Sequence, residues 1–204
     1  MKGLLLKDFY TVFKQMKVFL VLIIVFACLP GYSMFTFAIV YSAMLPFTAL
    51  AYDERSKWDK LAAMMPYSPR EIVLGKYVLG YIMIVFSSVF SILIQLIINQ
   101  LINHEASSTS AIQIALAICV ALVFESINLP IMIKLGVEKG RAVFIGAMAI
   151  IAFGIAYFGS ELGNLNTPSQ YDFKTITIVA VLCAIILNVL SIALSIRFYK
   201  NKAE

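Results

Sequence analysis

Apolar runs of about twenty residues recur along the chain and are separated by short polar segments. As a helix, a run of that length crosses the ~30 Å hydrocarbon core of a bilayer. An earlier run, 18–29, ends at Pro30 and would cover only about 18 Å as a helix. Either the preceding helix tilts in to extend it, or the span is short and thins the bilayer. The longer runs predict spans over residues 32–52, 73–103, 111–133, 142–158 and 175–198.

Residues 1–17 predict an amphipathic helix that lies in the headgroup plane and leads into the first span. Its face toward the lipid tails is expected to carry Leu5, Phe9, Val12, Phe13 and Met16. The charged residues Lys7, Asp8, Lys14 and Lys17 are expected to turn mostly away from that face.

Composition supports an all-α polytopic membrane protein with a single domain over residues 1–204. The chain is 62% hydrophobic and 13% charged, and its mean hydropathy is +0.94. The net charge of +5 would also suit a nucleic-acid binder, but the positions of the charges exclude that class. Six spans with both termini inside place fifteen of the 16 Lys and Arg residues on the cytoplasmic side and leave only Lys174 outside. The positive-inside rule therefore predicts six spans with both termini cytoplasmic. We expect the membrane to be the cell membrane of a bacterium.

Charge gathers in the segment after the second predicted span, where nine of the chain's 27 charged residues lie between Asp53 and Lys76. Residues 53–65 are amphipathic and predict one helix, with Trp58, Leu61, Ala62 and Met65 on its apolar face. Pro66 stops this helix. Ser68 and Glu71 then form a capping box with proline at the first helical position, so the next helix is expected to begin at Pro69.

The charged segment has two interpretations. One is a solvated loop that satisfies the positive-inside rule, which needs only Lys and Arg. The other is a docking surface for a soluble partner, which would account for mixed charge on a short, well-capped helix. The acidic residues that favour the second interpretation are Asp53, Glu54, Asp59 and Glu71.

The segment AYDERSKWDKLAAMMPYSPREIVLGKY resembles the corresponding part of small ABC-2-type transporter permeases. It shares with them an acidic pair, a tryptophan, a proline before the next helix and a Lys-Tyr pair entering the next span: Asp53, Glu54, Trp58, Pro66, Lys76 and Tyr77. The stretch 129–141, LPIMIKLGVEKGR, resembles a second part of that family. The nearest likeness is to the membrane subunits of exporters of amphipathic peptides such as phenol-soluble modulins.

The resemblance implies that residues 53–70 form a coupling loop between the second and third spans. The charged helix of this loop is then a cytoplasmic coupling helix, which docks in a groove of a separate ATPase. No GxxxxGK[ST] loop occurs in the chain, so ATP and Mg²⁺ are expected on that partner and no cofactor on this chain. Six spans make half a transporter, which implies a homodimer or a pair with a homologous permease. The residues that the resemblance assigns to ATPase coupling are Asp53, Glu54, Trp58, Asp59, Lys60, Pro66 and Arg70.

Polar residues inside the predicted spans are candidates for a substrate pathway. A band at four-residue spacing (Ser87, Ser91, Gln95, Asn99 and Asn103) either lines a cleft or supplies hydrogen bonds between helices. Glu125 is a carboxylate inside a span, and Asn128 follows it. Glu125 would attract a cationic substrate, carry a proton or brace a helix in which Pro130 frees the carbonyl of Ser126. The pathway candidates are therefore Gln95, Asn99, Glu125 and Asn128.

Small residues at Ala149, Ala152, Ala156 and Ser160 mark one face of the fifth span for close helix contact.

Other functions have less support. The chain holds one histidine, His104, without a metal or nucleophile motif around it, so no enzyme activity and no metal site are expected. The three cysteines lie in apolar runs and fit no disulfide framework. A secondary transporter or channel using Glu125 stays open, as does a sensor or immunity subunit paired with an ATPase.

Overall fold

A computed structural model describes residues 2–28, 32–102, 111–146 and 173–203. Within these ranges the chain is almost wholly helical, and residues 137–146 form a helix in addition to the seven labelled ones. The labelled helices are α1 (Lys2–Cys28), α2 (Tyr32–Ser42), α3 (Leu45–Arg55), α4 (Trp58–Ala63), α5 (Pro69–Ile102), α6 (Ala111–Leu135) and α8 (Phe173–Ala203).

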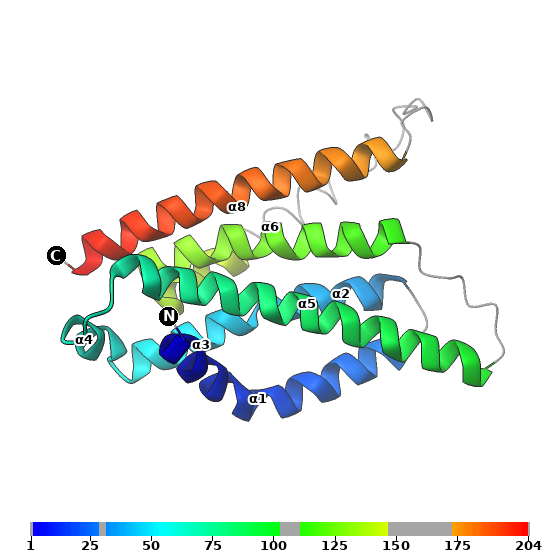
Figure 1. Ribbon diagram of the computed structural model, residues 1–204, viewed down its shortest axis with the longest axis horizontal. Coiled ribbons are helices and arrows are strands. Elements are labelled where there is room, and N and C mark those ends of the chain that lie inside the picture. Colours follow the sequence, from blue (N-terminus) through cyan, green and yellow to red (C-terminus); the bar gives the residue numbers. More distant parts are fainter. Residues whose placement is uncertain (1, 29–31, 103–110, 147–172, 204) are drawn as a thin grey trace.

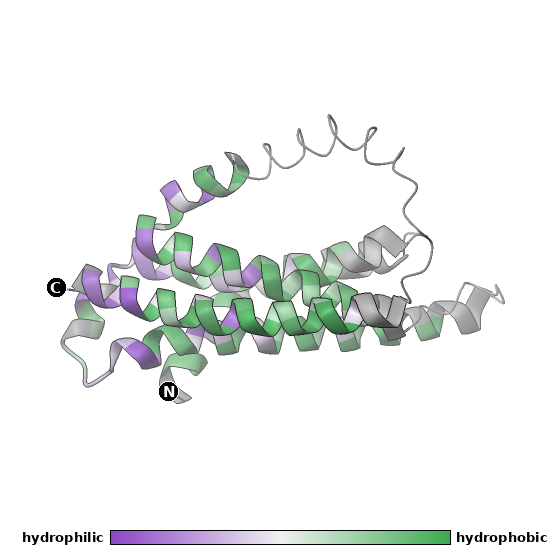
Figure 2. Ribbon diagram, turned by 90° about the horizontal axis from the view of Figure 1, so that it is seen from above, coloured by the Kyte–Doolittle hydropathy of each residue, from purple (hydrophilic) through white to green (hydrophobic). Residues whose placement is uncertain are grey.

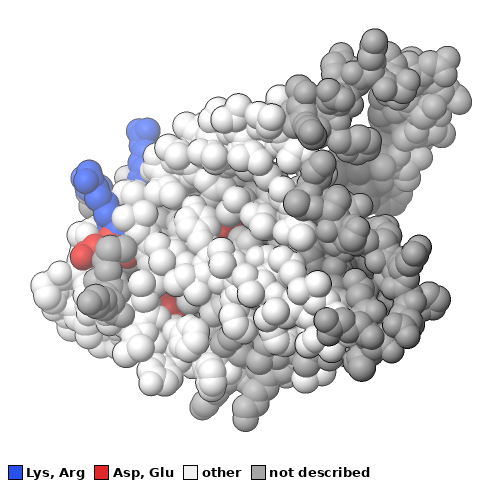
Figure 3. Space-filling view, turned by 45° about the vertical axis from the view of Figure 1, so that its right-hand side comes forward, with Lys and Arg blue, Asp and Glu red and all other residues white. Residues whose placement is uncertain are grey.

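The long helices α1, α5, α6 and α8 run along the length of the molecule, and α2 contacts α1, α5 and α6 (Figure 1). Both chain termini and α4 lie at the same end of the bundle, which we call the terminal end (Figures 1 and 2). Hydrophilic residues gather at that end, whereas the lengths of the helices are mostly hydrophobic (Figure 2). On the face drawn in Figure 3, Lys and Arg likewise lie at one end, with acidic atoms beside them, and most of the described surface beyond them is uncharged.

Three helices in the described part of the chain are long and apolar enough to cross a membrane: Pro69–Ile94 of α5, Ile114–Leu135 of α6 and Thr177–Asn201 of α8. They correspond to the third, fourth and sixth predicted spans. The first apolar run is continuous with the N-terminal helix, since α1 extends unbroken from Lys2 to Cys28 and is about 40 Å long. Of the fifth predicted span only residues 142–146 are described, and its row of small residues lies outside the described ranges.

The second predicted span is broken, which the prediction of one helix over 32–52 missed. α2 ends at Ser42 and α3 begins at Leu45, and each has 11 residues, about 16 Å. Pro46 explains the break, because it has no N–H to bond the carbonyl of Ser42 and its ring crowds that carbonyl. Tighter bonds replace the helical ones there, from the Ala43 N–H to the Val40 carbonyl and from the Met44 N–H to the Tyr41 carbonyl.

The N-terminal helix is present, but its orientation differs from the prediction. Asp8 and Val12 are buried against the bundle, whereas Phe9 and Phe13 are exposed. Asp8 was predicted on the polar side of this helix, away from its apolar face, and the prediction did not foresee its burial. Its cause is a charged partner, Lys76, that sits far along the chain.

Small side chains let the helices pack closely around the broken span. One buried cluster joins α1, α2, α3 and α5, and a second joins α2, α5 and α6. Close packing of this kind holds helices together in a bilayer, where the hydrophobic effect between helices is weak. The buried alanines of the two clusters are Ala38, Ala43, Ala49, Ala117 and Ala121.

Candidate functional site

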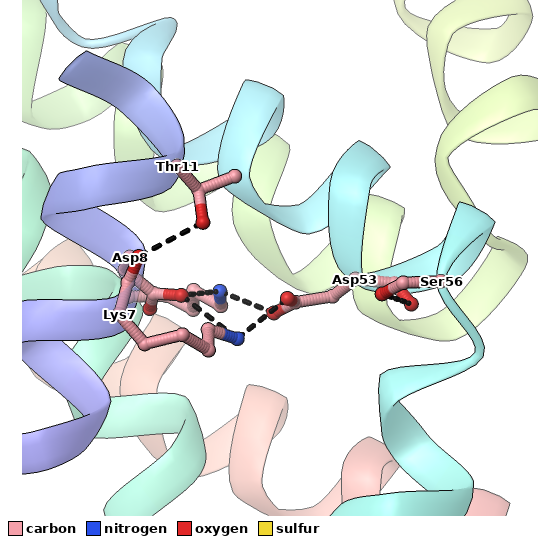
Figure 4. Close-up of polar contacts among 6 residues, drawn as sticks. Lys7, Asp8, Thr11, Asp53 and Ser56 are labelled. Carbon is pink, nitrogen blue, oxygen red and sulfur yellow. Dashed lines mark hydrogen bonds and ion pairs between the residues drawn. The ribbon is translucent and has the colours of Figure 1, made fainter. Parts of the chain in front are cut away.

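Four charged side chains from three helices meet at the terminal end and form what we call the ion cluster: Lys7 and Asp8 of α1, Asp53 of α3 and Lys76 of α5. The Lys76 ammonium lies 2.8 Å from Asp8 Oδ1 and 2.5 Å from Asp53 Oδ2. The Lys7 ammonium lies 2.5 Å from Asp53 Oδ1 and 3.0 Å from Asp8 Oδ1. Figure 4 shows the two ammonium groups between the two carboxylates.

The ion cluster is electrically balanced, with two positive and two negative charges. The side chains of Asp8 and Lys76 are each only 3% exposed. Charges removed from water are tolerated only when they are paired and hydrogen-bonded, and loss of one partner is far costlier than loss of a surface pair. The cluster therefore ties α1, α3 and α5 together near the place where the chain leaves the bundle to form α4.

The chain turns sharply between α3 and α4. α3 ends at Arg55, Lys57 adopts a left-handed backbone conformation (φ 52°), and α4 spans only six residues. The predicted single helix over 53–65 is therefore wrong. The turn allows Trp58 to pack against the buried cluster of Leu4, Ala62 and Ile72. The Lys7 ammonium lies 4.1 Å from the centre of the Trp58 ring. This cation–π contact and the packing offset the cost of the left-handed residue.

The capping box predicted at the start of α5 is confirmed. The Ser68 N–H donates to Glu71 Oε2 at 3.1 Å, and the Glu71 N–H donates to Ser68 Oγ at 3.3 Å. α5 begins at Pro69, as expected from these residues. The segment between α3 and α5 is thus fixed at one side by the ion cluster and at the other by this cap.

The outer part of the segment presents a mixed apolar and basic surface, which we call the α4 tip. Met64 is 85% exposed, and the other members of the tip are exposed as well. Ala62, on the opposite side of α4, is buried against Leu4 and Ile72. The α4 tip consists of Lys60, Leu61, Met64, Met65 and Pro66, with Arg70 exposed nearby in sequence.

Glu54 connects the same region to the helix over residues 137–146. Its Oε2 accepts the backbone N–H of Val137 at 2.7 Å, so Glu54 supplies the N-terminal cap of that helix. Gly136 adopts φ +81°, and a Cβ there would come within 2.8 Å of Glu54 Oε1. The Glu54 carboxylate therefore occupies space that a side chain on residue 136 would need.

A second polar cluster lies deeper, between α5, α6 and α8. The Tyr77 hydroxyl lies 2.5 Å from Ser191 Oγ and 2.8 Å from Ser195 Oγ. Ser191 Oγ donates to the carbonyl of Ser126, the group that Pro130 leaves without its helical partner. Because Ser191 has one proton, Tyr77 must donate to Ser191 and accept from Ser195. Ser195 of α8 therefore donates to Tyr77 of α5, Tyr77 donates to Ser191 of α8, and Ser191 donates to the Ser126 carbonyl of α6.

Asn188 extends this contact along α8. Its side-chain oxygen accepts the Tyr81 hydroxyl at 2.9 Å, and its amide nitrogen donates to the carbonyl of Leu122 at 3.2 Å. Tyr81 is on α5 and Leu122 is on α6, so one amide joins three helices.

Glu125 lies in the same layer of α6 and is 0% exposed. Neither of its carboxyl oxygens has a hydrogen-bond partner among the described residues. The carboxyl group lies directly on Gly80 of α5, where an added Cβ would come within 1.9 Å of Oε1. Asn128 donates to the carbonyl of Phe124 at 2.9 Å, while its own side-chain oxygen has no partner in the described part.

The family model for ABC-2 family transporter proteins matches residues 3–200 of the chain. The chain belongs to the ABC-2 transporter family. Membership makes it an integral membrane protein and a permease subunit of an ABC transporter, and it implies an ABC ATPase partner. No curated protein and no solved structure matches the chain.

In this ABC-2 permease the predicted coupling residues separate into two groups. Asp53 belongs to the ion cluster, Glu54 caps the helix over 137–146, and Trp58 packs beneath Lys7. These three make contacts within the chain. Glu54 is also exposed, as are Lys60, Pro66 and Arg70, which form the second group. Asp59 lies in α4 with its side chain outside the description.

The predicted pathway residues also separate. Glu125 and Asn128 are both buried at the contact of α6 with its neighbours, whereas the side chains of Gln95 and Asn99 on α5 are not described. Ser87 donates to the carbonyl of Ala38 on α2 at 3.3 Å, which is the inter-helix role considered for it.

Sequence reasoning missed the polar residues of α8 that hold this permease together. Asn188, Ser191 and Ser195 recur at helical spacing within an otherwise apolar run, so they face one side of α8. Such a row predicts hydrogen bonds to a neighbouring helix. Their partners Tyr77 and Tyr81 are themselves four residues apart on α5.

Proposed function

We propose that this ABC-2 permease is half of an exporter, with six spans, both termini in the cytoplasm and a second permease copy or homologue as its partner in the membrane. The α4 tip docks in a groove of the ATPase. ATP binding draws two such tips together and switches a cleft between inward and outward access. The cargo is an amphipathic or hydrophobic molecule, a peptide by resemblance to the exporters of such peptides.

The observation that carries the docking proposal is the exposure of the α4 tip. Leu61, Met64 and Met65 are apolar and exposed, yet they belong to α4 and the turn after it, at the end of the bundle where hydrophilic residues gather (Figures 1 and 2). Exposed apolar side chains bordered by charged residues are typical of protein interaction sites. Lys60 and Arg70 supply that border.

The base of the α4 tip also suits transmission of force. Trp58 and Ala62 pack onto α1 and α5 through Leu4 and Ile72, and the ion cluster fixes α3. A push on the tip would therefore reach three helices through a few buried contacts, without the intervention of a long flexible loop.

The test is to co-express the full chain with each ATPase encoded beside it, purify through a tag on the permease, and measure bound ATPase and ATP hydrolysis. The docking variant is Leu61→Ser. The matched control is Leu6→Ser, because Leu6 is exposed to a similar degree on α1 (58% against 50%). Association should fall for Leu61→Ser and persist for Leu6→Ser.

Equal association for the two variants would exclude the α4 tip as the docking surface. An ATPase that binds through the tip, but whose hydrolysis moves no amphipathic peptide in reconstituted vesicles, would favour a sensor or immunity subunit. Failure of every ATPase to bind would leave a secondary transport mechanism through Glu125.

A further inference from the structure

Glu125 is a fully buried carboxyl group in the middle of a candidate membrane span. Its oxygens accept no hydrogen bond from the described residues, and Gly80 leaves space for it against the α5 backbone. The carboxyl group fills the place that a side chain on residue 80 would take, so the packing of α6 against α5 holds it there.

Among the residues that the structure describes, no positively charged group bonds to this carboxyl group. The titratable groups that interact with it electrostatically are Tyr77 and Tyr81 of α5, and both phenols bond to α8. The ammonium of Lys76, four residues before Gly80 on α5, is held by Asp8 and Asp53.

In the described ranges, the other elements packed against α6 add no buried charge to this layer either. α2 contains no Asp, Glu, Lys, Arg or His, and the side chains of α8 that reach this layer are uncharged Asn188, Ser191 and Ser195. Phe144 of the helix over 137–146 contacts Phe124, but the charged residues of that helix, Glu138, Lys139 and Arg141, are exposed. The sequence from 147 to 172 includes no Lys, Arg or His.

An ionised carboxylate without a partner is very costly in a dry, low-dielectric site, and a bound proton removes most of that cost. We propose that Glu125 is a proton-binding site: it holds a proton while α6 packs on Gly80 of α5, and it releases the proton when the two helices separate and water reaches it. This inference does not depend on ATPase coupling, because it concerns the packing of this chain alone.

The sign of the pH effect follows from the proton count. The packed state holds one proton that a hydrated carboxyl group has lost above about pH 5. The state with more bound protons is disfavoured as pH rises, by up to about tenfold in the equilibrium constant for each pH unit. Packing of α5 against α6 should therefore weaken as pH increases.

The first test compares thermal unfolding of the full chain in lipid nanodiscs for wild type, Glu125→Gln and Glu138→Gln between about pH 6 and pH 8.5. Glutamine retains the shape of the neutral acid and cannot ionise. Wild type should lose stability relative to Glu125→Gln as pH rises, while Glu138→Gln, which alters an exposed carboxylate, should follow wild type. A difference between wild type and Glu125→Gln that is constant with pH, or that grows in favour of wild type, would overturn the proposal.

The second test is chemical and remains decisive if Glu125→Gln fails to accumulate. Dicyclohexylcarbodiimide reacts with protonated carboxyl groups in apolar surroundings: the acid O–H adds across a C=N bond, the oxygen joins the central carbon and the proton moves to nitrogen. The acyl group then migrates to nitrogen and gives a stable N-acylurea, which peptide mass spectrometry locates.

Label on Glu125 in nanodiscs that decreases as pH rises is the expected result. The proposal is overturned if the folded chain takes up no label at Glu125 under conditions that label this residue in the acid-unfolded chain.

Discussion

The ammonium nitrogen of Lys76 lies 2.8 Å from a carboxylate oxygen of Asp8, 68 positions away in the chain. The next residue, Tyr77, contacts Ser191 on α8. Adjacent residues on a helix point about 100° apart, so this Lys-Tyr pair holds α5 to α1 and α3 on one side and to α8 on the other. The pair that resembles a family motif is therefore a structural junction of the bundle.

Replacement of Lys76 with methionine should destabilise the protein strongly. The variant keeps the length of the side chain but leaves Asp8 and Asp53 to share only Lys7. Breaking a buried ion cluster by removal of one partner costs about 3–5 kcal/mol, which would be measured as a lower unfolding midpoint in detergent.

Lys139→Met is the matched control, because Lys139 is exposed and its loss should change stability little. Adding Asp53→Asn to Lys76→Met should restore part of the loss, since it removes the excess negative charge and leaves Lys7 to balance Asp8. A small effect of Lys76→Met would show that the ion cluster is not buried in the membrane-embedded protein.

The features that sequence predicted well have local causes. The capping box at Ser68 and Glu71 depends on residues three positions apart, and Pro66 and Pro69 fix the backbone around it. The long apolar runs of α5, α6 and α8 needed only length and composition. The carbonyl of Ser126 was correctly expected to lose its helical bond, because the reason lies four residues away at Pro130.

The features that sequence missed depend on contacts between distant segments. Asp8 and Lys7 looked like the solvated side of an amphipathic helix, and only the position of Lys76 turns them inward. Glu54 stays a predicted coupling residue, but its bond to the Val137 N–H, 83 positions away, could not be read from the sequence. The break before Pro46 is different: its cause is local, and a proline inside an apolar run should have indicated it.

Gly80→Ala should be far more disruptive than Gly75→Ala, although both glycines lie in α5. A Cβ at residue 80 would come 1.9 Å from the Glu125 carboxyl group, whereas a Cβ at residue 75 meets nothing within 4 Å. We expect Gly80→Ala to cost about 1–3 kcal/mol by overpacking and Gly75→Ala to be neutral or stabilising by about 0.5–1 kcal/mol. Unfolding midpoints of the two variants test this, and equal midpoints would mean that Glu125 does not lie on Gly80.

Ser191→Ala and Pro130→Ala should be coupled in stability. With Pro130 in place, the Ser191 hydroxyl is the partner of the Ser126 carbonyl, and its loss should cost about 0.6–1.7 kcal/mol. Alanine at position 130 restores an N–H that can bond this carbonyl within the helix. Ser191→Ala should then cost less, and a double-mutant cycle measures the difference. Additive effects would show that the two groups do not share the carbonyl.

Glu54 and Leu61 should give opposite results when stability and ATPase binding are measured together. Glu54→Ala removes the acceptor of the Val137 N–H, so unfolding should become easier by about 0.5–1 kcal/mol, while the exposed α4 tip stays available to the ATPase. Glu54→Gln keeps an acceptor without the charge, so its unfolding midpoint should fall between those of wild type and Glu54→Ala.

Leu61→Ser should leave the unfolding midpoint nearly unchanged, because the side chain is half exposed, and should weaken ATPase association instead. Loss of ATPase binding in Glu54→Gln without any change of stability would assign Glu54 to the docking surface, against the capping role that its contact with Val137 indicates.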